Sequence, residues 1–168
     1  MEIVFIRHGE TDWNRIGRHM GQQDIPLNEV GREQALIMKE KLANMDFDCC
    51  YASPLKRAKE TAEIICAGKC EIIFDDRLKE RYGGDMEGKV FEKWEEYLSN
   101  PTIEKDDEIL KRAQDFFNMI RKKDYKRILI VSHNGLLKNL QHCILGETGN
   151  VDYSKNNLKN CDIKIFNI

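Results

Sequence analysis

Basic and titratable side chains follow the ends of three predicted strands. Arg7 and His8 come directly after the apolar run 3–6, Arg57 lies in the first turn predicted after the run 47–52, and His133 follows the run 128–131. In open α/β sheets, ligands bind beyond the carboxyl ends of parallel strands. We therefore expect these four side chains to converge on one site.

The residue types of this group favour a phosphate site. An arginine guanidinium grips two phosphate oxygens at once and stays charged near neutral pH, and Arg57 would also lie in the positive field of a helix N-terminus. The backbone amides of Asn134 and Gly135, at the start of the helix predicted after His133, could supply further donors.

His8 is the predicted nucleophile of this site. A neutral imidazole nitrogen can attack phosphorus and form a phosphohistidine, which water then hydrolyses. The departing alkoxide needs a proton, and Glu80 is the predicted general acid, with Glu87 as its rival. Glu10 and Glu87 are otherwise interpreted as residues that maintain loop structure.

Other phosphatase chemistries do not fit the spacing of the motifs. A cysteine-dependent phosphatase loop needs C-x5-R, whereas seven and six residues separate Cys49 and Cys50 from Arg57. No G-x-x-x-x-G-K-[ST] loop occurs, which excludes a P-loop nucleotidase. No histidine, cysteine and carboxylate cluster has metal-ligand spacing, so we expect no metal.

Predicted strands alternate with predicted helices along the whole chain. Alternation of this kind predicts an α/β domain, here a three-layer α/β/α sandwich around a mostly parallel central sheet. Residues 1–168 are expected to form a single domain, with a short lid-like segment over 81–105. The predicted strands are 3–6, 47–52, 70–74, 128–131 and the edge strand 162–168.

Cap residues set the predicted helix boundaries. Asn28 should cap a helix with apolar positions at Val30, Ala35, Leu36, Met38 and Leu42. Ser53 and Pro54 should open the helix that ends at Ala67. The other predicted helices are 106–122, one after His133, and one over 91–98 that carries Phe91, Trp94, Tyr97 and Leu98.

Bulk composition narrows the function classes. The chain has 168 residues, a formal net charge of -2 and a pI of about 6.1, which argues against a general nucleic-acid or anionic-membrane binder. No secretory signal and no stretch of ~18 apolar residues is visible, so a cytoplasmic location without a membrane partner is expected. The six cysteines are then expected to be reduced thiols. The sequence carries no signal for an oligomeric state.

Four motifs together resemble the histidine phosphatase superfamily, also called the phosphoglycerate mutase-like family, and within it the phosphatase branch. The resemblance covers most of the chain. The motifs are Arg7-His8-Gly9-Glu10-Thr11 with Asn14, Ser53-Pro54-Leu55 with Arg57, Glu80 with Gly83, and Val131-Ser132-His133-Asn134-Gly135.

The resemblance implies a role for each site residue. His8 would carry the phosphoryl group, Glu80 would donate the proton, and Arg7, Arg57 and His133 would hold the phosphate. Asn14, Gly21 and Asn134 would complete the substrate site. The family works without a metal or organic cofactor.

The predicted activity is hydrolysis of a phosphate monoester of a small phosphorylated metabolite. The alternatives are a phosphoglycerate mutase, an α-ribazole phosphatase and a non-catalytic phospholigand-binding module. Hydrolysis is preferred over mutase activity because the segment from Arg81 to Lys105 is short and acidic, which favours a site open to water. Met20 also stands where mutase-like relatives tend to have a small hydroxylated residue.

Overall fold

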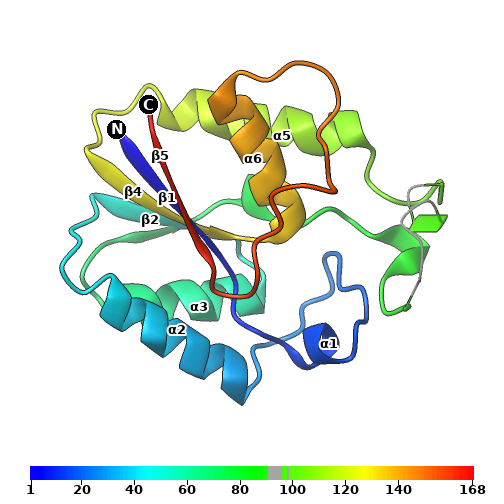
Figure 1. Ribbon diagram of the computed structural model, residues 1–168, viewed down its shortest axis with the longest axis horizontal. Coiled ribbons are helices and arrows are strands. Elements are labelled where there is room, and N and C mark those ends of the chain that lie inside the picture. Colours follow the sequence, from blue (N-terminus) through cyan, green and yellow to red (C-terminus); the bar gives the residue numbers. More distant parts are fainter. Residues whose placement is uncertain (91–95, 98) are drawn as a thin grey trace.

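A five-stranded sheet forms the centre of the described part of the protein, with the strand order β3-β2-β4-β1-β5 (Figure 1). The structure is a computed structural model that describes residues 1–90, 96, 97 and 99–168. Neighbouring strands from β3 to β1 run parallel, and β5 pairs antiparallel with β1. The strands are β1 (Glu2–Arg7), β2 (Cys49–Ala52), β3 (Ile72–Phe74), β4 (Arg127–Ser132) and β5 (Ile163–Asn167).

Helices cover both faces of this sheet, so the predicted three-layer α/β/α fold is confirmed. Figure 1 shows α2 and α3 on one face and α5 and α6 on the other. The helices of the described residues are α1 (Asp12–Arg15), α2 (Glu29–Lys41), α3 (Lys56–Cys66), α5 (Asp106–Ile120) and α6 (Asn134–Leu145), with 3-10 turns η1 (Asp76–Leu78) and η2 (Gly84–Met86).

The alternation of side chains along β1 explains the two cores. Ile3 and Phe5 pack with α5 and α6, whereas Val4 and Ile6 pack with α2 and α3. Successive residues of a strand point to opposite faces, and all four of these side chains are buried. A strand apolar on both faces therefore lies inside the sheet, and its last residues emerge at the carboxyl edge.

Asn28 caps α2 as predicted, because its side-chain oxygen accepts a hydrogen bond from the amide of Gly31 at 2.8 Å. The predicted apolar face of α2 is wrong at Val30 and Leu36, which are exposed. The helix packs by Gly31 and by the predicted positions Ala35, Met38 and Leu42, which are buried. A Cβ atom on Gly31 would lie 2.1 Å from the Glu10 carbonyl oxygen, so only glycine permits this close approach.

The predicted start of α3 is also wrong. The helix begins at Lys56, its N-cap is Leu55, and no side chain caps it. The Ser53 hydroxyl instead lies 2.8 Å from the Nε2 atom of His133. A serine before a helix usually caps it, and here a long-range partner competes successfully for the hydroxyl.

The remaining predicted elements agree with the structure where it describes them. The strand 70–74, the helix 106–122, the helix after His133 and the edge strand near the C-terminus are all present. Of the helix predicted over 91–98, Phe91, Trp94 and Leu98 lie outside the described residues, and Tyr97 is buried. The loop predicted after Glu10 contains α1, a single turn with a capping box between Thr11 and Asn14.

The six cysteines are free thiols, as predicted. No helix among the described residues is long and apolar enough to cross a membrane.

Candidate active site

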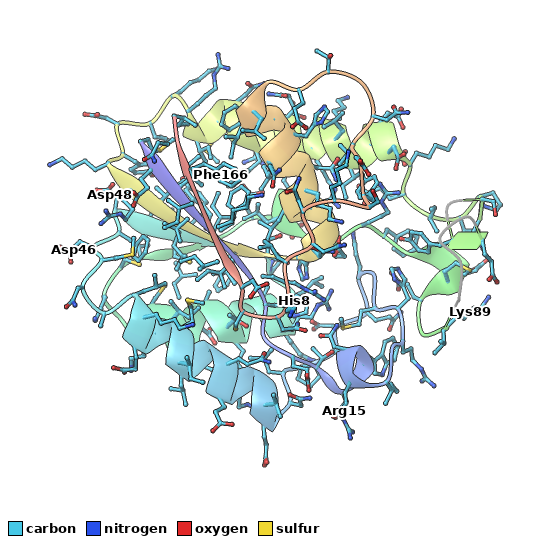
Figure 2. The ribbon with its side chains drawn as sticks, viewed as in Figure 1. His8, Arg15, Asp46, Asp48, Lys89 and Phe166 are labelled. Atoms are coloured by element: carbon cyan, nitrogen blue, oxygen red, sulfur yellow. The ribbon has the colours of Figure 1, made fainter. Side chains whose placement is uncertain are left out.

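The pairing of the strands brings the predicted site residues to one edge of the sheet. β4 lies between β1 and β2, with Arg7 in register with Ser132 and Ala52 in register with Val131. His8, Ser53 and His133 are the residues that follow these three adjacent strand ends. Figure 2 shows His8 at this carboxyl edge, just beyond β1. The predicted convergence is therefore present in the fold.

The ring of His8 is buried and oriented by its own loop. Its Nδ1 atom lies 2.7 Å from the Gly9 carbonyl oxygen, which can only accept, so Nδ1 carries the proton and Nε2 keeps a lone pair. Burial lowers the pKa of His8 well below its ordinary value, and the positive charges of Arg57 and Arg7 lower it further. His8 is therefore a neutral imidazole whose Nε2 atom can act as a nucleophile.

His133 lies beside His8, with 5.1 Å between the ring centroids. The Ser53 hydroxyl oxygen accepts a bond from the Leu55 amide at 3.4 Å and lies 2.8 Å from the Nε2 atom of His133. In one of the two tautomers that this contact allows, the hydroxyl proton points to Nε2 and the ring proton lies on Nδ1. Burial lowers the pKa of His133 well below its ordinary value, followed by the charge of Arg57. His133 is thus a neutral ring that can donate through Nδ1.

Arg57 is fully buried at the start of α3. Its two terminal nitrogens donate to the carbonyl oxygens of Gln23 and Gly21, both at 2.7 Å. Burial lowers the pKa of Arg57 to about 10, and the negative charge of Glu80 opposes that shift. The guanidinium therefore stays protonated at neutral pH, although its hydrogen-bonded partners are neutral carbonyl groups.

Arg7 supplies a second cation at the same edge. Its Nη1 atom donates to the Leu158 carbonyl oxygen at 2.7 Å. Burial lowers the pKa of Arg7, and the charges of Glu80 and Asp162 raise it in part. Glu80 thus acts electrostatically on both arginines.

Three buried nitrogen atoms of this group have no hydrogen-bond partner among the described residues: Arg7 Nε, Arg57 Nε and His133 Nδ1. A buried donor without a partner costs about 1–3 kcal/mol, and native proteins contain few of them. Here they belong to side chains that converge on one edge of the sheet. A tetrahedral oxyanion has the lone pairs and the charge to satisfy all three donors together.

Glu80 follows η1 and reaches the first turn of α6. Its Oε1 atom accepts from the Arg81 amide at 2.8 Å, and its Oε2 atom accepts from the Gly135 amide at 3.1 Å. The expectation that the Gly135 amide is free to bind phosphate is therefore wrong, because this amide donates its hydrogen bond to the Glu80 carboxylate.

The main chain that carries Glu80 is held by Arg112 on α5. The Arg112 guanidinium donates to the carbonyl oxygens of Arg77, Lys79 and Glu80 at 2.7, 2.6 and 3.0 Å. It also forms an ion pair with Glu104 at 2.6 Å. Sequence reasoning missed Arg112, since nothing in a helical arginine indicates a distant loop as its partner.

Asn14 and Gly21 are connected by hydrogen bonds to the residues around His8 and Arg57. The Asn14 side-chain oxygen accepts from Asn160 at 3.2 Å, and Asn160 also donates to the His8 carbonyl oxygen at 3.0 Å. Gly21 has a positive φ of 51° and contributes the carbonyl oxygen that binds Arg57. The sequence gives no signal for Asn160, which comes from a loop near the C-terminus.

The side chain of Asn134 has protein partners. Its nitrogen donates to Asn157 at 3.0 Å, and its oxygen accepts from the Leu158 amide at 3.1 Å. These bonds hold the segment whose carbonyl binds Arg7. The substrate contacts predicted for Asn14, Gly21 and Asn134 stay predictions.

Glu87 connects two loops, as interpreted from the sequence. Its Oε1 atom accepts from the amides of Gln22 and Gly83 at 2.7 and 3.0 Å. Glu10 accepts from the side chain of Asn28 at 2.9 Å. In the part of the chain that the structure describes, no group of three or more His, Cys, Asp or Glu side chains could hold a metal ion.

The Ser53→Ala variant tests how the His133 tautomer is set. Without the hydroxyl, the proton of the His133 ring should also be found on Nε2. The value of kcat/KM should then fall about tenfold, which corresponds to the free energy of one hydrogen bond. Nitrogen NMR of the His133 ring should report Nδ1–H in the wild type and a mixture in the variant. An unchanged tautomer in Ser53→Ala would contradict this role of Ser53.

Comparisons with known proteins agree with this geometry. The histidine phosphatase superfamily (branch 1) matches residues 3–168. The chain is 37% identical over 158 residues to phosphoglycerate mutase-like protein 4 of Arabidopsis thaliana, covering 83% of this chain and 69% of the relative. It is 37% identical over 157 residues to a metal-independent phosphoserine phosphatase of the same plant, covering 82% and 66%.

A solved structure extends the likeness to the fold. A phosphoserine phosphatase mutant from Entamoeba histolytica in complex with phosphoserine superposes with a TM-score of 0.85 at 29% identity, covering 98% of this chain and 89% of that one. The chain spans about two thirds of the length of the two plant relatives. This chain belongs to the histidine phosphatase superfamily, and it is a hydrolase.

Proposed function

We propose that the protein hydrolyses phosphate monoesters of a small metabolite through a phosphohistidine on His8. The observation that carries this proposal is the hydrogen bond from His8 Nδ1 to the Gly9 carbonyl, which leaves Nε2 as the free nucleophile in the positive field of Arg7 and Arg57. A ring of the opposite tautomer could not attack phosphorus from that atom.

The first half-reaction transfers the phosphoryl group to His8. Arg7, Arg57 and the Nδ1 proton of His133 bind the phosphate oxygens and compensate their charge. The Nε2 lone pair of His8 attacks phosphorus while the bond between phosphorus and the ester oxygen breaks. Glu80 in its protonated form gives its proton to that oxygen, and the product leaves as an alcohol.

The second half-reaction returns the enzyme to its starting state. In this proposal Glu80, now a carboxylate, takes a proton from a water molecule, and the water oxygen attacks the phosphorus of phospho-His8. The nitrogen–phosphorus bond breaks, the electron pair returns to Nε2, and inorganic phosphate leaves. The arginines supply the positive charge that a metal ion supplies in other phosphatases, which supports a metal-independent reaction, and one relative is named metal-independent.

Arg81 is the buried cation at the start of the predicted lid, and its contacts favour hydrolysis over mutase activity. Its guanidinium forms an ion pair with Asp106 at 2.5 Å and stacks over Tyr153 at 4.6 Å. A mutase must hold its product until the phosphoryl group returns, which calls for uncommitted cations above the site. Arg81 is already neutralised by Asp106.

We propose further that residues 1–168 form one domain; residues 91–95 and 98 of the lid-like segment predicted over 81–105 lie outside the described residues. The pairing of β1 with both β4 and β5 supports a single domain, because it joins the first and last strands in one sheet.

Six free thiols support a cytoplasmic location, where cysteines stay reduced.

Purified protein should release inorganic phosphate from several small monoesters, phosphoserine among them. It should interconvert 2- and 3-phosphoglycerate at less than a hundredth of that rate even when 2,3-bisphosphoglycerate is supplied, a difference of ~2.7 kcal/mol in barrier. A coupled assay that follows both products in one sample decides this. Mutase turnover faster than phosphate release would overturn the assignment.

Glu80→Gln should separate substrates by their leaving group. An alkyl phosphate needs a proton on its departing oxygen, so transfer of its phosphoryl group to His8, measured as the first turnover, should slow about 100-fold or more. The p-nitrophenolate ion leaves unaided, and transfer of the phosphoryl group from p-nitrophenyl phosphate to His8, measured as the first turnover, should slow less than tenfold. Equal losses on the two substrates would remove Glu80 from the acid role.

A further inference from the structure

The first turn of α6 is in direct contact with the carboxyl group of Glu80. Gly135 is the second residue of α6, and its amide donates to Oε2 of Glu80 at 3.1 Å. The other oxygen, Oε1, is held by the Arg81 amide at 2.8 Å. Both oxygens of the proposed acid are thus fixed by backbone donors.

A side chain at position 135 would occupy the space of that carboxyl group. A Cβ atom built on Gly135 lies 2.4 Å from Oε1 and 3.2 Å from the carboxyl carbon of Glu80. Atoms of this kind do not approach within 3.0 Å, so one of the two groups has to move. The Glu80 carboxyl group is the end of a flexible side chain, whereas Gly135 is part of the α6 backbone.

The backbone at Gly135 does not itself require glycine. Its φ is not positive, unlike that of seven other glycines of the described chain, and it lies inside a regular helix. Alanine is favoured over glycine in a helix. The space taken by Glu80 is therefore the feature that singles out glycine at this position.

The loop before Glu80 is anchored independently of Gly135. Arg112 binds three of its carbonyl oxygens, and the Ser132 hydroxyl donates to the Leu78 carbonyl at 2.7 Å. A side chain at position 135 would therefore displace the carboxyl group and leave the main chain of Glu80 in place.

We propose that Gly135 is a positioning residue for the general acid. The absence of a side chain admits the Glu80 carboxyl group to the start of α6, and the Gly135 amide fixes its direction toward the leaving oxygen. This role rests on the proposed function of Glu80. Among the described residues the partner of the Gly135 amide outside α6 is the Glu80 carboxyl group.

The test is a double-mutant cycle with Gly135→Ala, Glu80→Gln and the combined variant. Gly135→Ala should slow first-turnover phosphoryl transfer from an alkyl phosphate tenfold or more, and from p-nitrophenyl phosphate less than threefold. In the Glu80→Gln background the same substitution should add no further loss, because its effect passes through Glu80. The melting temperature should stay the same or rise.

The outcomes separate this inference from the proposed function. If Glu80→Gln slows the two substrates equally, the acid role fails and the proposed function with it. If Glu80→Gln is selective for the alkyl substrate but Gly135→Ala is not, the positioning role of Gly135 is overturned alone. Additive losses in the combined variant, or loss of the first turnover with p-nitrophenyl phosphate in Gly135→Ala, would overturn it equally.

Discussion

The structure depends on two guanidinium groups at the carboxyl edge of the sheet, that of Arg57, which is fully buried, and that of Arg7, which is partly buried. Removing a charged group from water is costly unless partners compensate it. For Arg57 the hydrogen-bonded partners in the described chain are the carbonyl oxygens of Gly21 and Gln23, and for Arg7 the partner is that of Leu158. These bonds fix the loops around the site and leave positive charge for an anion. Phosphate should therefore stabilise the fold as well as bind to it.

The same charge determines the state of the two histidines. The arginines lower the pKa of His8 and of His133, in addition to the larger effect of burial. A protonated His8 would have no lone pair with which to attack phosphorus, so the cations that bind the substrate also keep the nucleophile in its reactive form. The Gly9 carbonyl then fixes the ring proton of His8 on Nδ1, and the Ser53 hydroxyl contacts Nε2 of His133.

The sequence indicates the general position of the site because that position follows from local patterns. Apolar runs that end at His8 and at His133 predict strands, and parallel strands bring their carboxyl ends together. The cap at Asn28 is equally local, since its partner lies three residues away. The order of the strands is set by pairing between distant segments and has no comparable local signal.

Contacts between distant segments explain what the sequence does not reveal. Ser53 has the local pattern of a helix cap, yet its partner His133 is 80 residues away. Arg112 holds a loop more than 30 residues before it, and Gly135 accommodates a carboxyl group 55 residues before it. In each case the partner lies far along the chain, where local sequence patterns do not indicate it.

The central claim is that His8 carries the phosphoryl group, and the most direct measurement is its isolation on that residue. The enzyme should be mixed with ³²P-labelled phosphoserine, quenched in alkali within the first turnover, digested and analysed by mass spectrometry. The account predicts acid-labile phosphate on the peptide that contains His8, approaching one per active site, and none in His8→Ala. Turnover without label on His8, or phosphate release by His8→Ala at the wild-type rate, would contradict it.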